Sequence, residues 1–291
     1  MELNHLEVTA PPRAAASVVM LRDSAAGMEV LLQKRHAASS VLGGAHVFPG
    51  GKLDPADLEL DMAAHLDRDV QALYEALREP DLPVLEAAGL HVAALREAFE
   101  ECGLLLAHGA PQRVAELAAM RASRGVSFNQ LLADLSLRLD TTNLVPWSRW
   151  ITPKVPSVTS KRFDTRFFIA LVDAQVEVSH DDHELVETVW LQPRAALEMY
   201  WQGRLMLAPP QIMSLAHLSH HANGRQVLAA ARADGPALIE PHTCEIDGER
   251  VVCYPGDERH PVARRALPGP SRLVFRNRRF EPLGGFETLL P

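Results

Sequence analysis

The sequence predicts an α/β fold, because short β-type runs and longer helix-type runs follow one another along most of the chain. Hydrophobic residues make up 47% and charged residues 23% of the chain, which is ordinary globular composition. With 291 residues the chain is long enough to bury a full core, either as one large domain or as one domain with an extension.

The first elements predicted are strands. Residues 17–21 and 29–33 are rich in β-forming side chains and flank a turn at 23–27, so they predict a hairpin. Residues 43–53 (GGAHVFPGGKL) predict a further short strand that is interrupted by glycines. The chain therefore begins with a sheet.

Helices are predicted next. Leucines and alanines recur at helical spacing from residue 57 to about 85, and Gly89 stands just ahead of a second helix that begins near Ala94. Residues 112–139 predict two more helices with Gly125 between them.

Strands return in the second half of the chain. Residues 167–172 and 185–191 predict buried strands, and 193–202 begins like a helix with proline in its first turn. Later signals are sparser: one helix-like stretch at 210–222 and a hairpin whose turn is Asp247-Gly248.

Composition excludes several classes of protein. The net charge of −8 argues against a general nucleic-acid binder, which normally shows a basic surface. Residues 1–21 do not resemble a signal peptide, and no run approaches the roughly 18 apolar residues that a membrane-spanning helix needs. Three cysteines are too few for a disulfide framework, so we expect a cytoplasmic protein that does not contact membranes.

The helix near residues 94–103 carries an unusual cluster of carboxylates. At 100° per residue Glu97, Glu100 and Glu101 share one face. The opposite face carries the apolar residues Leu95, Ala98, Phe99 and Cys102. Gly103 follows where a left-handed helix cap is expected.

This acidic face has two interpretations. It could be a solvated surface, which is the usual explanation for a charge cluster. However, carboxylates at i and i+4 repel each other, and only Arg96 is near enough in the sequence to offset them. A bound cation is the alternative, and oxygen-only ligands suit Mg²⁺ or Mn²⁺ better than zinc.

The same residues resemble the Nudix box, whose pattern is G-x5-E-x7-R-E-U-x-E-E-x-G-U with U aliphatic. Residues 96–104 (REAFEECGL) match its second half, Gly51 supplies the first glycine, and Asp57 stands where the family has glutamate. The seven-residue spacer is replaced by the 38 residues 58–95. A Nudix subgroup that includes the mammalian peroxisomal coenzyme A diphosphatase is similar in having a long helical insertion here. Residues 150–153 and 162–168 also resemble that subgroup.

The resemblance implies a Nudix α/β/α sandwich with a mixed sheet, a helical insertion lobe and a C-terminal extension. The Nudix domain would span 1–215, with the insertion at about 58–89, and residues 216–291 would pack on it. The glycine turn and the acidic helix would then be neighbours in space. We expect the insertion to lie outside the sheet and to shape substrate access.

By the same resemblance, Glu97, Glu100 and Glu101 would hold Mg²⁺ or Mn²⁺, together with the backbone carbonyl of Gly50. Arg96 would pair with a carboxylate and orient it. Asp57 is expected to be structural, because the insertion separates it in sequence from its usual partners.

The implied activity is metal-dependent hydrolysis of the diphosphate bond in a nucleoside diphosphate linked to another moiety. Coenzyme A or acyl-coenzyme A is the leading substrate, giving 3′,5′-ADP and an (acyl-)4′-phosphopantetheine. The alternatives are another nucleotide, such as ADP-ribose, a dinucleotide or capped RNA, and a sensor that binds a nucleotide without cleaving it. We expect a small-molecule nucleotide as partner and consider a homodimer.

Further residues have a functional and a structural interpretation. Residues 31–51 resemble in part a coenzyme A pyrophosphatase signature, in which Arg35 would contact phosphate rather than being a surface arginine. Arg162 and Arg166 alternate with Asp164 on one strand face, as substrate contacts or as a local ion pair. Glu184 and Glu187 would supply a general base or belong to a solvated turn.

The predicted hairpin at residues 242–253 brings cysteines together. Pairing Ile246 with Glu249 places His242, Cys244 and Cys253 on one face, near His260. A zinc site is one interpretation, but the spacing matches no zinc motif. Small apolar cysteines on the packed face of the hairpin are the simpler explanation.

Overall fold

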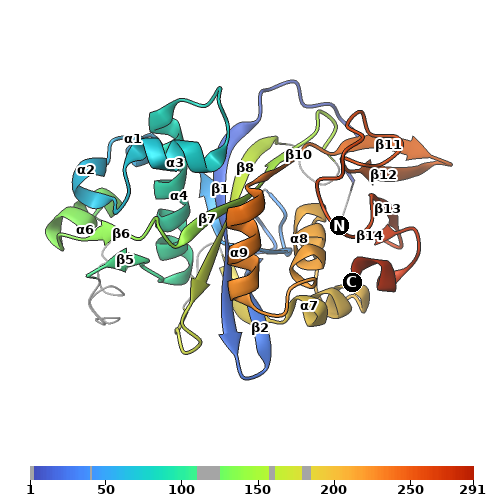
Figure 1. Cartoon of the computed structure of the whole chain (residues 1–291). Coiled ribbons are helices and arrows are strands. Elements are labelled where there is room, and N and C mark those ends of the chain that lie inside the picture. Colours follow the sequence, from blue (N-terminus) through green and yellow to red (C-terminus); the bar gives the residue numbers. More distant parts are fainter. Residues whose placement is uncertain (1–2, 40, 110–124, 157–160, 179–184) are drawn as a thin grey trace.

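A mixed β-sheet forms the centre of the protein in this computed structural model, which describes residues 3–39, 41–109, 125–156, 161–178 and 185–291 (Figure 1). The strand order is β10-β7-β8-β1-β2-β3, while β4 pairs with β1 and β9 with β2. The strands are β1 (Arg13–Ser24), β2 (Gly27–Arg35), β3 (His46–Val47), β4 (Gly50–Lys52), β7 (Leu144–Ile151), β8 (Phe163–Val172), β9 (Leu185–Leu191) and β10 (Ala237–Ile239). Because β1 runs parallel to β8 and antiparallel to β2, the sheet is mixed, as predicted.

Helix α4 (Val84–Cys102) covers one face of this sheet together with the insertion (Figure 1). The smaller elements beside it are α1 (Pro55–Leu58), α2 (Met62–His65), α3 (Val70–Leu77), α6 (Phe128–Asp134) and the short strands β5 (Ala107–His108) and β6 (Arg138–Leu139). Their leucines and alanines join the sheet residues Val18, Leu31 and Phe168 in one buried cluster. The insertion therefore shares the core of the sheet.

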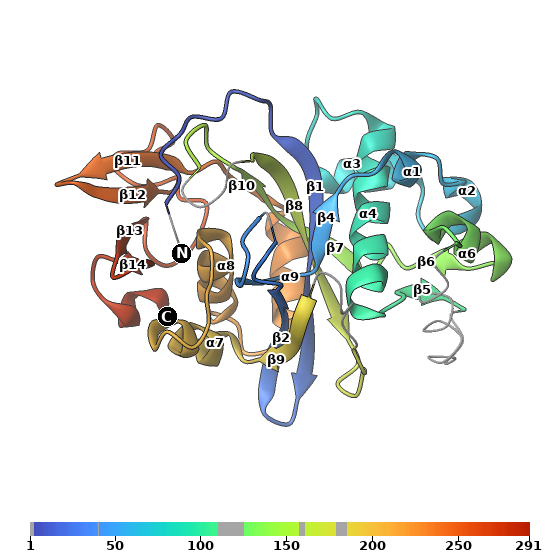
Figure 2. The ribbon, with the colours of Figure 1, turned by 180° about the vertical axis from the view of Figure 1, so that it is seen from behind.

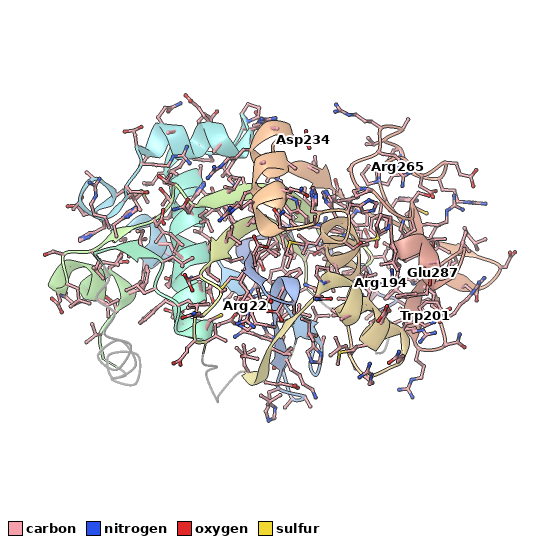
Figure 3. All side chains as sticks on the ribbon, turned by 60° about the horizontal axis from the view of Figure 1, so that its bottom comes forward. Arg22, Arg194, Trp201, Asp234, Arg265 and Glu287 are labelled. Carbon is pink, nitrogen blue, oxygen red and sulfur yellow. The ribbon has the colours of Figure 1, made fainter. Side chains whose placement is uncertain are left out.

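The other face is covered by helices and by a second sheet. The elements are α7 (Pro193–Trp201), α8 (Pro209–Leu218), α9 (Gly224–Asp234), β11 (His242–Ile246), β12 (Glu249–Cys253), β13 (Arg272–Arg276), β14 (Arg279–Pro282) and the 3₁₀ helix η1 (Phe286–Leu289). Figure 3 shows Trp201 of α7 near Glu287 of η1, and the Trp201 ring lies 5.7 Å from that of Phe286. These two layers around the sheet confirm the α/β/α sandwich.

The C-terminal residues are part of the same hydrophobic core. Leu273, Phe280 and Leu289 join the cluster that contains Val19 and Ile169 of the main sheet. The predicted boundary at residue 215 falls inside α8, and β10 adds a strand to the main sheet beyond it. Residues 216–291 thus pack directly on the Nudix-type layers.

Helix α4 is longer than predicted. The prediction placed Gly89 ahead of the helix, but the helix begins at Val84 and runs through Gly89 without a break. A Cβ at this position would lie 2.4 Å from Cδ2 of Leu58, so glycine allows α1 to pack closely on α4. Gly103 caps the helix with φ of 70°, as predicted.

Most other predicted elements are present. The first hairpin is β1–β2, residues 185–191 form β9, and the second of the two helices predicted in 112–139 is α6. The first of those helices lies in 110–124, outside the described residues. The sequence did not reveal β7, whose apolar run contains a proline beside an irregularity in pairing, nor α9 and the short strands β10, β13 and β14.

The C-terminal hairpin has the predicted register. Ile246 pairs with Glu249 across the turn, and Cys244 and Cys253 pack together with Val251 and Val274. The zinc interpretation is wrong for His260, because one ring nitrogen contacts the carbonyl of Glu240 and the other accepts from the N–H of Val262. Packed cysteines, the simpler explanation, are observed. Among the described residues, no helix is long and apolar enough to cross a membrane.

A buried ion-pair network fastens the insertion to the sheet. Glu79, between α3 and α4, contacts Arg166 at 2.6 Å and Arg149 at 2.8 Å. Both arginines also contact Asp164, at 3.1 and 2.7 Å. The Arg166 side chain is only 4% exposed and that of Glu79 only 10%, so solvent screens these charges weakly.

Glu79→Gln is therefore expected to lower the free energy of unfolding by about 3 kcal/mol, because two guanidinium groups would lose a buried partner. Urea-induced unfolding measures this loss. The matched control is Glu198→Gln, which breaks an exposed ion pair with Arg194 on α7 and should change stability little. Equal effects of the two variants would contradict the interpretation.

Candidate active site

A cavity of about 670 Å³ is lined by the glycine-rich β4 segment, by α4, by the ends of β1, β7 and β8, and by the start of α8. Figure 2 shows β4 between β1 and α4. Its acidic wall consists of Glu97, Glu100 and Glu101 beside Gly50 and Gly51. The sequence prediction that the glycine turn and the acidic helix are neighbours is confirmed. The two segments are separated by the insertion in the chain but line one space.

The glycines allow this close approach. The Gly50 N–H donates to Glu101 Oε2 at 2.9 Å, and a Cβ on Gly50 would lie 2.5 Å from the Ala16 carbonyl oxygen. A Cβ on Gly51 would lie 2.2 Å from Glu97 Oε1. Any larger residue at either position would displace the backbone or the carboxylate. Gln33 of β2 also holds the end of α4 in place, because its side-chain amide donates to the Glu101 carbonyl at 3.0 Å.

Arg96 connects the carboxylates. Its Nη1 lies 2.8 Å from both Glu97 Oε1 and Glu100 Oε2, and its Nε and Nη2 lie 2.7 and 3.1 Å from the two oxygens of Asp57. Burial alone would lower the pKa of Arg96, but the hydrogen bonds to Asp57 and the surrounding carboxylates raise it, so the guanidinium stays charged. The pairing that the sequence assigned to Arg96 is observed.

Asp57 is closer to this site than the sequence suggested. The insertion separates it from Arg96 in sequence, yet its carboxylate forms a bidentate pair with Arg96 and is 1% exposed. It also accepts from the Asp54 N–H at 2.8 Å, in a capping box that begins α1. The argument from sequence separation is therefore wrong, because α1 folds back onto α4.

Asp57→Asn is expected to lower kcat/KM by about tenfold, since the loss of one charged hydrogen-bond pair to Arg96 is worth about 1.5 kcal/mol. Steady-state kinetics and the melting temperature should be measured together. Asp61→Asn is the control, because Asp61 caps the neighbouring helix α2 without contacting Arg96. A variant with unchanged activity would show that the pair does not position Arg96.

The donor set fits a hard divalent cation. The acidic wall offers only carboxylate oxygens, and such ligands suit Mg²⁺ or Mn²⁺. Burial raises the pKa of the Glu97 carboxyl, the neighbouring carboxylates add to this, and Arg96 opposes it. A cation beside Glu97 would favour its ionised form. The Glu100 side chain is 48% exposed and so is accessible from the cavity.

Basic side chains line the same cavity. Arg35 is among them, where the sequence proposed a phosphate contact, and Arg13, Lys52 and Lys161 also contribute. No sequence pattern predicted the last three, although Lys52 directly follows the glycine turn. Anions that enter the cavity would meet these cations opposite a carboxylate wall.

Two other predicted substrate contacts lie elsewhere. Arg166 belongs to the buried network with Glu79, and Arg162 donates to the Thr152 carbonyl at 2.9 Å while only 9% exposed. Neither side chain lines the cavity. The local ion pair, which was the structural alternative for Arg166, is the arrangement found.

The predicted general base is not at the cavity either. Glu187 of β9 lies 4.0 Å from the buried ring of His46, and it does not line the cavity. Strand alternation puts Glu187 on the face of Val189 and Leu191, which packs towards α7 and α8, whereas α4 lies on the other face. Glu184 lies outside the described residues.

The insertion takes no part in the cavity lining. Residues 58–89 are all described, and none of them lines it, which argues against the expectation that the insertion shapes substrate access. The C-terminal extension does contribute, through Pro241, Thr243 and Val252. Sequence reasoning could not find these residues, because no local pattern links them to positions almost two hundred residues earlier.

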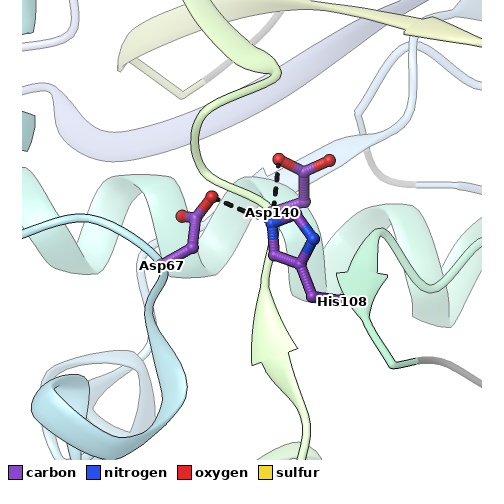
Figure 4. Close-up of side chains that lie close together, drawn as sticks. All are labelled: Asp67, His108 and Asp140. Atoms are coloured by element: carbon purple, nitrogen blue, oxygen red, sulfur yellow. Dashed lines mark hydrogen bonds and ion pairs between the residues drawn. The ribbon is translucent and has the colours of Figure 1, made fainter.

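A second acidic group lies apart from the cavity (Figure 4). Asp67, His108 and Asp140 approach one another, with His108 Nε2 3.1 Å from Asp67 and 3.6 Å from Asp140. Asp67 already accepts from the Thr141 N–H, the Thr141 hydroxyl and the Thr142 N–H, and these bonds hold its pKa at about 2 despite burial. These bonds give Asp67 a structural role in joining the insertion to residues 141–142.

Comparisons with known proteins show the family. The model of the NUDT19 Nudix domain matches residues 6–218. The acyl-coenzyme A diphosphatase NUDT19 of Xenopus laevis is 28% identical over 271 residues, which cover 80% of this chain and 71% of that protein. The human acyl-coenzyme A diphosphatase NUDT19 is 29% identical over 235 residues, covering 68% of this chain and 62% of that protein.

A solved structure gives the same result for the fold. The crystal structure of a NUDIX hydrolase from Alicyclobacillus acidocaldarius has a TM-score of 0.60 and 28% sequence identity, covering 76% of this chain and 97% of that chain. The family model alone matches well over half of the chain, and it includes the glycine turn, Arg96 and the carboxylates of α4. The chain belongs to the Nudix hydrolase family, in the group described by the NUDT19 Nudix domain.

Proposed function

We propose that the protein is a metal-dependent diphosphatase that cleaves coenzyme A or acyl-coenzyme A into 3′,5′-ADP and (acyl-)4′-phosphopantetheine. The observation that carries this proposal is one cavity lined by three kinds of side chain: the carboxylates of α4, basic groups and apolar groups. The name of the Xenopus laevis relative, an acyl-coenzyme A diphosphatase, supports the same substrate class.

The walls of the cavity match the parts of this substrate. Acyl-coenzyme A joins an anionic nucleotide to a long arm that is mostly hydrocarbon and amide. Arg35, Lys52 and Lys161 line the cavity with positive charge, while Trp150, Phe163 and Val252 line it with apolar surface. Binding sites for such mixed ligands are usually apolar with a few placed polar groups.

Glu97, Glu100 and Glu101 are the residues that would hold the divalent cation, with the Gly50 carbonyl as a further predicted ligand. When bound there, such a cation would supply positive charge, polarisation of the phosphorus–oxygen bond and a lower pKa for an attacking water. The residues of the chain supply positioning: Arg96 holds Glu97 and Glu100 at 2.8 Å, and the Gly50 N–H holds Glu101. Fixed positions of this kind account for most of the catalysis in phosphoryl transfer.

Two alternatives are weaker. Another nucleotide, such as ADP-ribose, a dinucleotide or capped RNA, would use the same carboxylates. Such a substrate would not explain why Pro241 and Val252 of the extension add apolar surface to the cavity. A sensor that does not cleave has no need of the three carboxylates, all of which are present and line the cavity. The cytoplasmic location and the homodimer stay predictions from the sequence.

A substrate panel tests the proposal. The protein should be incubated with Mg²⁺ or Mn²⁺ and coenzyme A, acyl-coenzyme A species of several chain lengths, ADP-ribose or a dinucleotide, and the products identified by mass spectrometry. We expect 3′,5′-ADP and the matching phosphopantetheine to form fastest. Faster cleavage of ADP-ribose or of the dinucleotide would reassign the substrate, and cleavage of none of them would overturn the proposed reaction.

A further inference from the structure

We propose that the part of the cavity beside Gln211 is a subsite for the amide-containing arm of the substrate, and that the side-chain oxygen of Gln211 accepts a hydrogen bond from an amide N–H there. The inference rests on the proposed function and adds to it. It names the residues that would bind the amide-containing arm of the substrate, and it gives the C-terminal extension a role.

Gln211 is the polar group that points to this ligand. It lies in the first turn of α8, lines the cavity and is only 6% exposed. Within the described part of the chain, its side-chain oxygen has no hydrogen-bond partner. A buried acceptor without a donor is unfavourable, so a ligand that brings an N–H or O–H into the cavity would satisfy it.

The surroundings of Gln211 are poor in hydrogen-bond donors. Pro209 and Pro210 precede it on α8, Pro241 and Val252 come from the extension, and all four line the same cavity. Proline has no N–H, and a valine side chain has no polar atom. An aliphatic chain with an occasional amide suits such a wall better than a group that needs many polar partners.

The aromatic residues here are not arranged as a stacking platform for adenine. The Trp150 ring lies 6.4 Å from Phe167 and 5.9 Å from Tyr254, in edge-to-face contacts, and Phe48 meets Phe167 at 88°. Trp150 and Phe167 are each only 5% exposed, so little of either ring is open to a ligand. Nucleotide bases stack on open aromatic faces, so these two rings do not favour a base beside them.

The extension holds this wall in place. The Thr243 hydroxyl donates to the Val155 carbonyl at 3.1 Å, which ties β11 to the segment after β7 that carries the cavity residues Pro153 and Pro156. Arg250 of the same sheet donates to the Asn4 carbonyl at 3.2 Å. The extension is therefore tied to the segment after β7, and Val252 of β12 lines the same cavity.

Gln211→Leu tests the hydrogen bond. It removes the acceptor while keeping a buried side chain of similar length. The measurement is the dissociation constant of 4′-phosphopantetheine and, separately, of 3′,5′-ADP, by calorimetry with Mn²⁺ present. We expect 4′-phosphopantetheine to bind about tenfold more weakly and 3′,5′-ADP to bind within about twofold of the original protein. Ser214→Ala, a buried change one turn along α8 and away from the cavity, should alter neither constant.

The outcomes separate the two proposals. If the original protein cleaves coenzyme A but Gln211→Leu leaves the affinity for 4′-phosphopantetheine unchanged, the subsite is overturned and the proposed function stands. An equal loss for both ligands would place Gln211 on the nucleotide and also overturn the inference. If coenzyme A is not cleaved at all, the proposed function falls, whatever the two dissociation constants are.

A pair of valines on β12 tests the role of the extension. Val252 lines the cavity, whereas its neighbour Val251 packs on the other face with Cys253 and Val274, and both side chains are buried. Val252→Ala should change the ratio of kcat/KM for a long acyl-coenzyme A to that for free coenzyme A by about threefold or more. Val251→Ala loses the same methyl groups and should leave that ratio unchanged. The same ratio in both variants would show that the extension does not shape the subsite.

Discussion

Replacing Glu101 by glutamine is expected to lower kcat by about 10²–10³, which corresponds to about 2.7–4 kcal/mol of lost transition-state stabilisation. Glu101 is buried beside the cavity, and its carboxylate accepts the Gly50 N–H at 2.9 Å. Glutamine keeps an oxygen that can accept this bond, so the glycine turn should stay in place. What it removes is the negative charge that a divalent cation needs.

Glu100→Gln is expected to have an effect of the same order, because Glu100 also lines the cavity and its carboxylate forms an ion pair with Arg96. Turnover and the rise in melting temperature on adding Mn²⁺ should be measured for both variants. The control is Glu86→Gln, at the opposite end of the same helix and away from the cavity. Small and equal losses in all three variants would mean that the acidic face is only a solvated helix surface.

The acidic helix could be predicted because its pattern is local. Glu97, Glu100 and Glu101 lie within one helical turn and a half, and the glycine turn is equally compact, so periodicity and residue type define both segments. Their contact through Gly50 and Glu101 followed from the family resemblance and is observed. The reason given for a structural role of Asp57, its separation in sequence from its usual partners, does not hold, because its carboxylate contacts Arg96.

The apolar lining that α8 and β12 give to the cavity could not be predicted in the same way. Val252 and Gln211 become neighbours of Phe167 only through long-range packing of β12 and α8 on the main sheet, which no window of the sequence contains. The same limitation explains Arg166. Its alternation with Asp164 was visible, but its buried partner Glu79 comes from the insertion 87 residues earlier.

Removing divalent metal is expected to abolish turnover, which makes it the largest single effect. In the described structure the Arg96 guanidinium forms ion pairs with Glu97 and Glu100, and it also forms one with Asp57. Three carboxylates, those of Asp57, Glu97 and Glu100, against this one guanidinium give the four residues a net charge of −2. A diphosphate would add further negative charge, so substrate and carboxylates would repel each other without an intervening cation.

Exhaustive treatment with EDTA, followed by addition of Mg²⁺ or Mn²⁺, measures this dependence. Activity should vanish and return with the metal, and the melting temperature should rise on addition. At a metal concentration about one hundred times its dissociation constant, the gain in stability is about 2.7 kcal/mol. Glu101→Gln should show a smaller rise than the original protein, because one ligand charge is missing, whereas Glu86→Gln should show the full rise. Full turnover after chelation would contradict the metal-dependent reaction, and with it the argument that Glu97, Glu100 and Glu101 hold a cation.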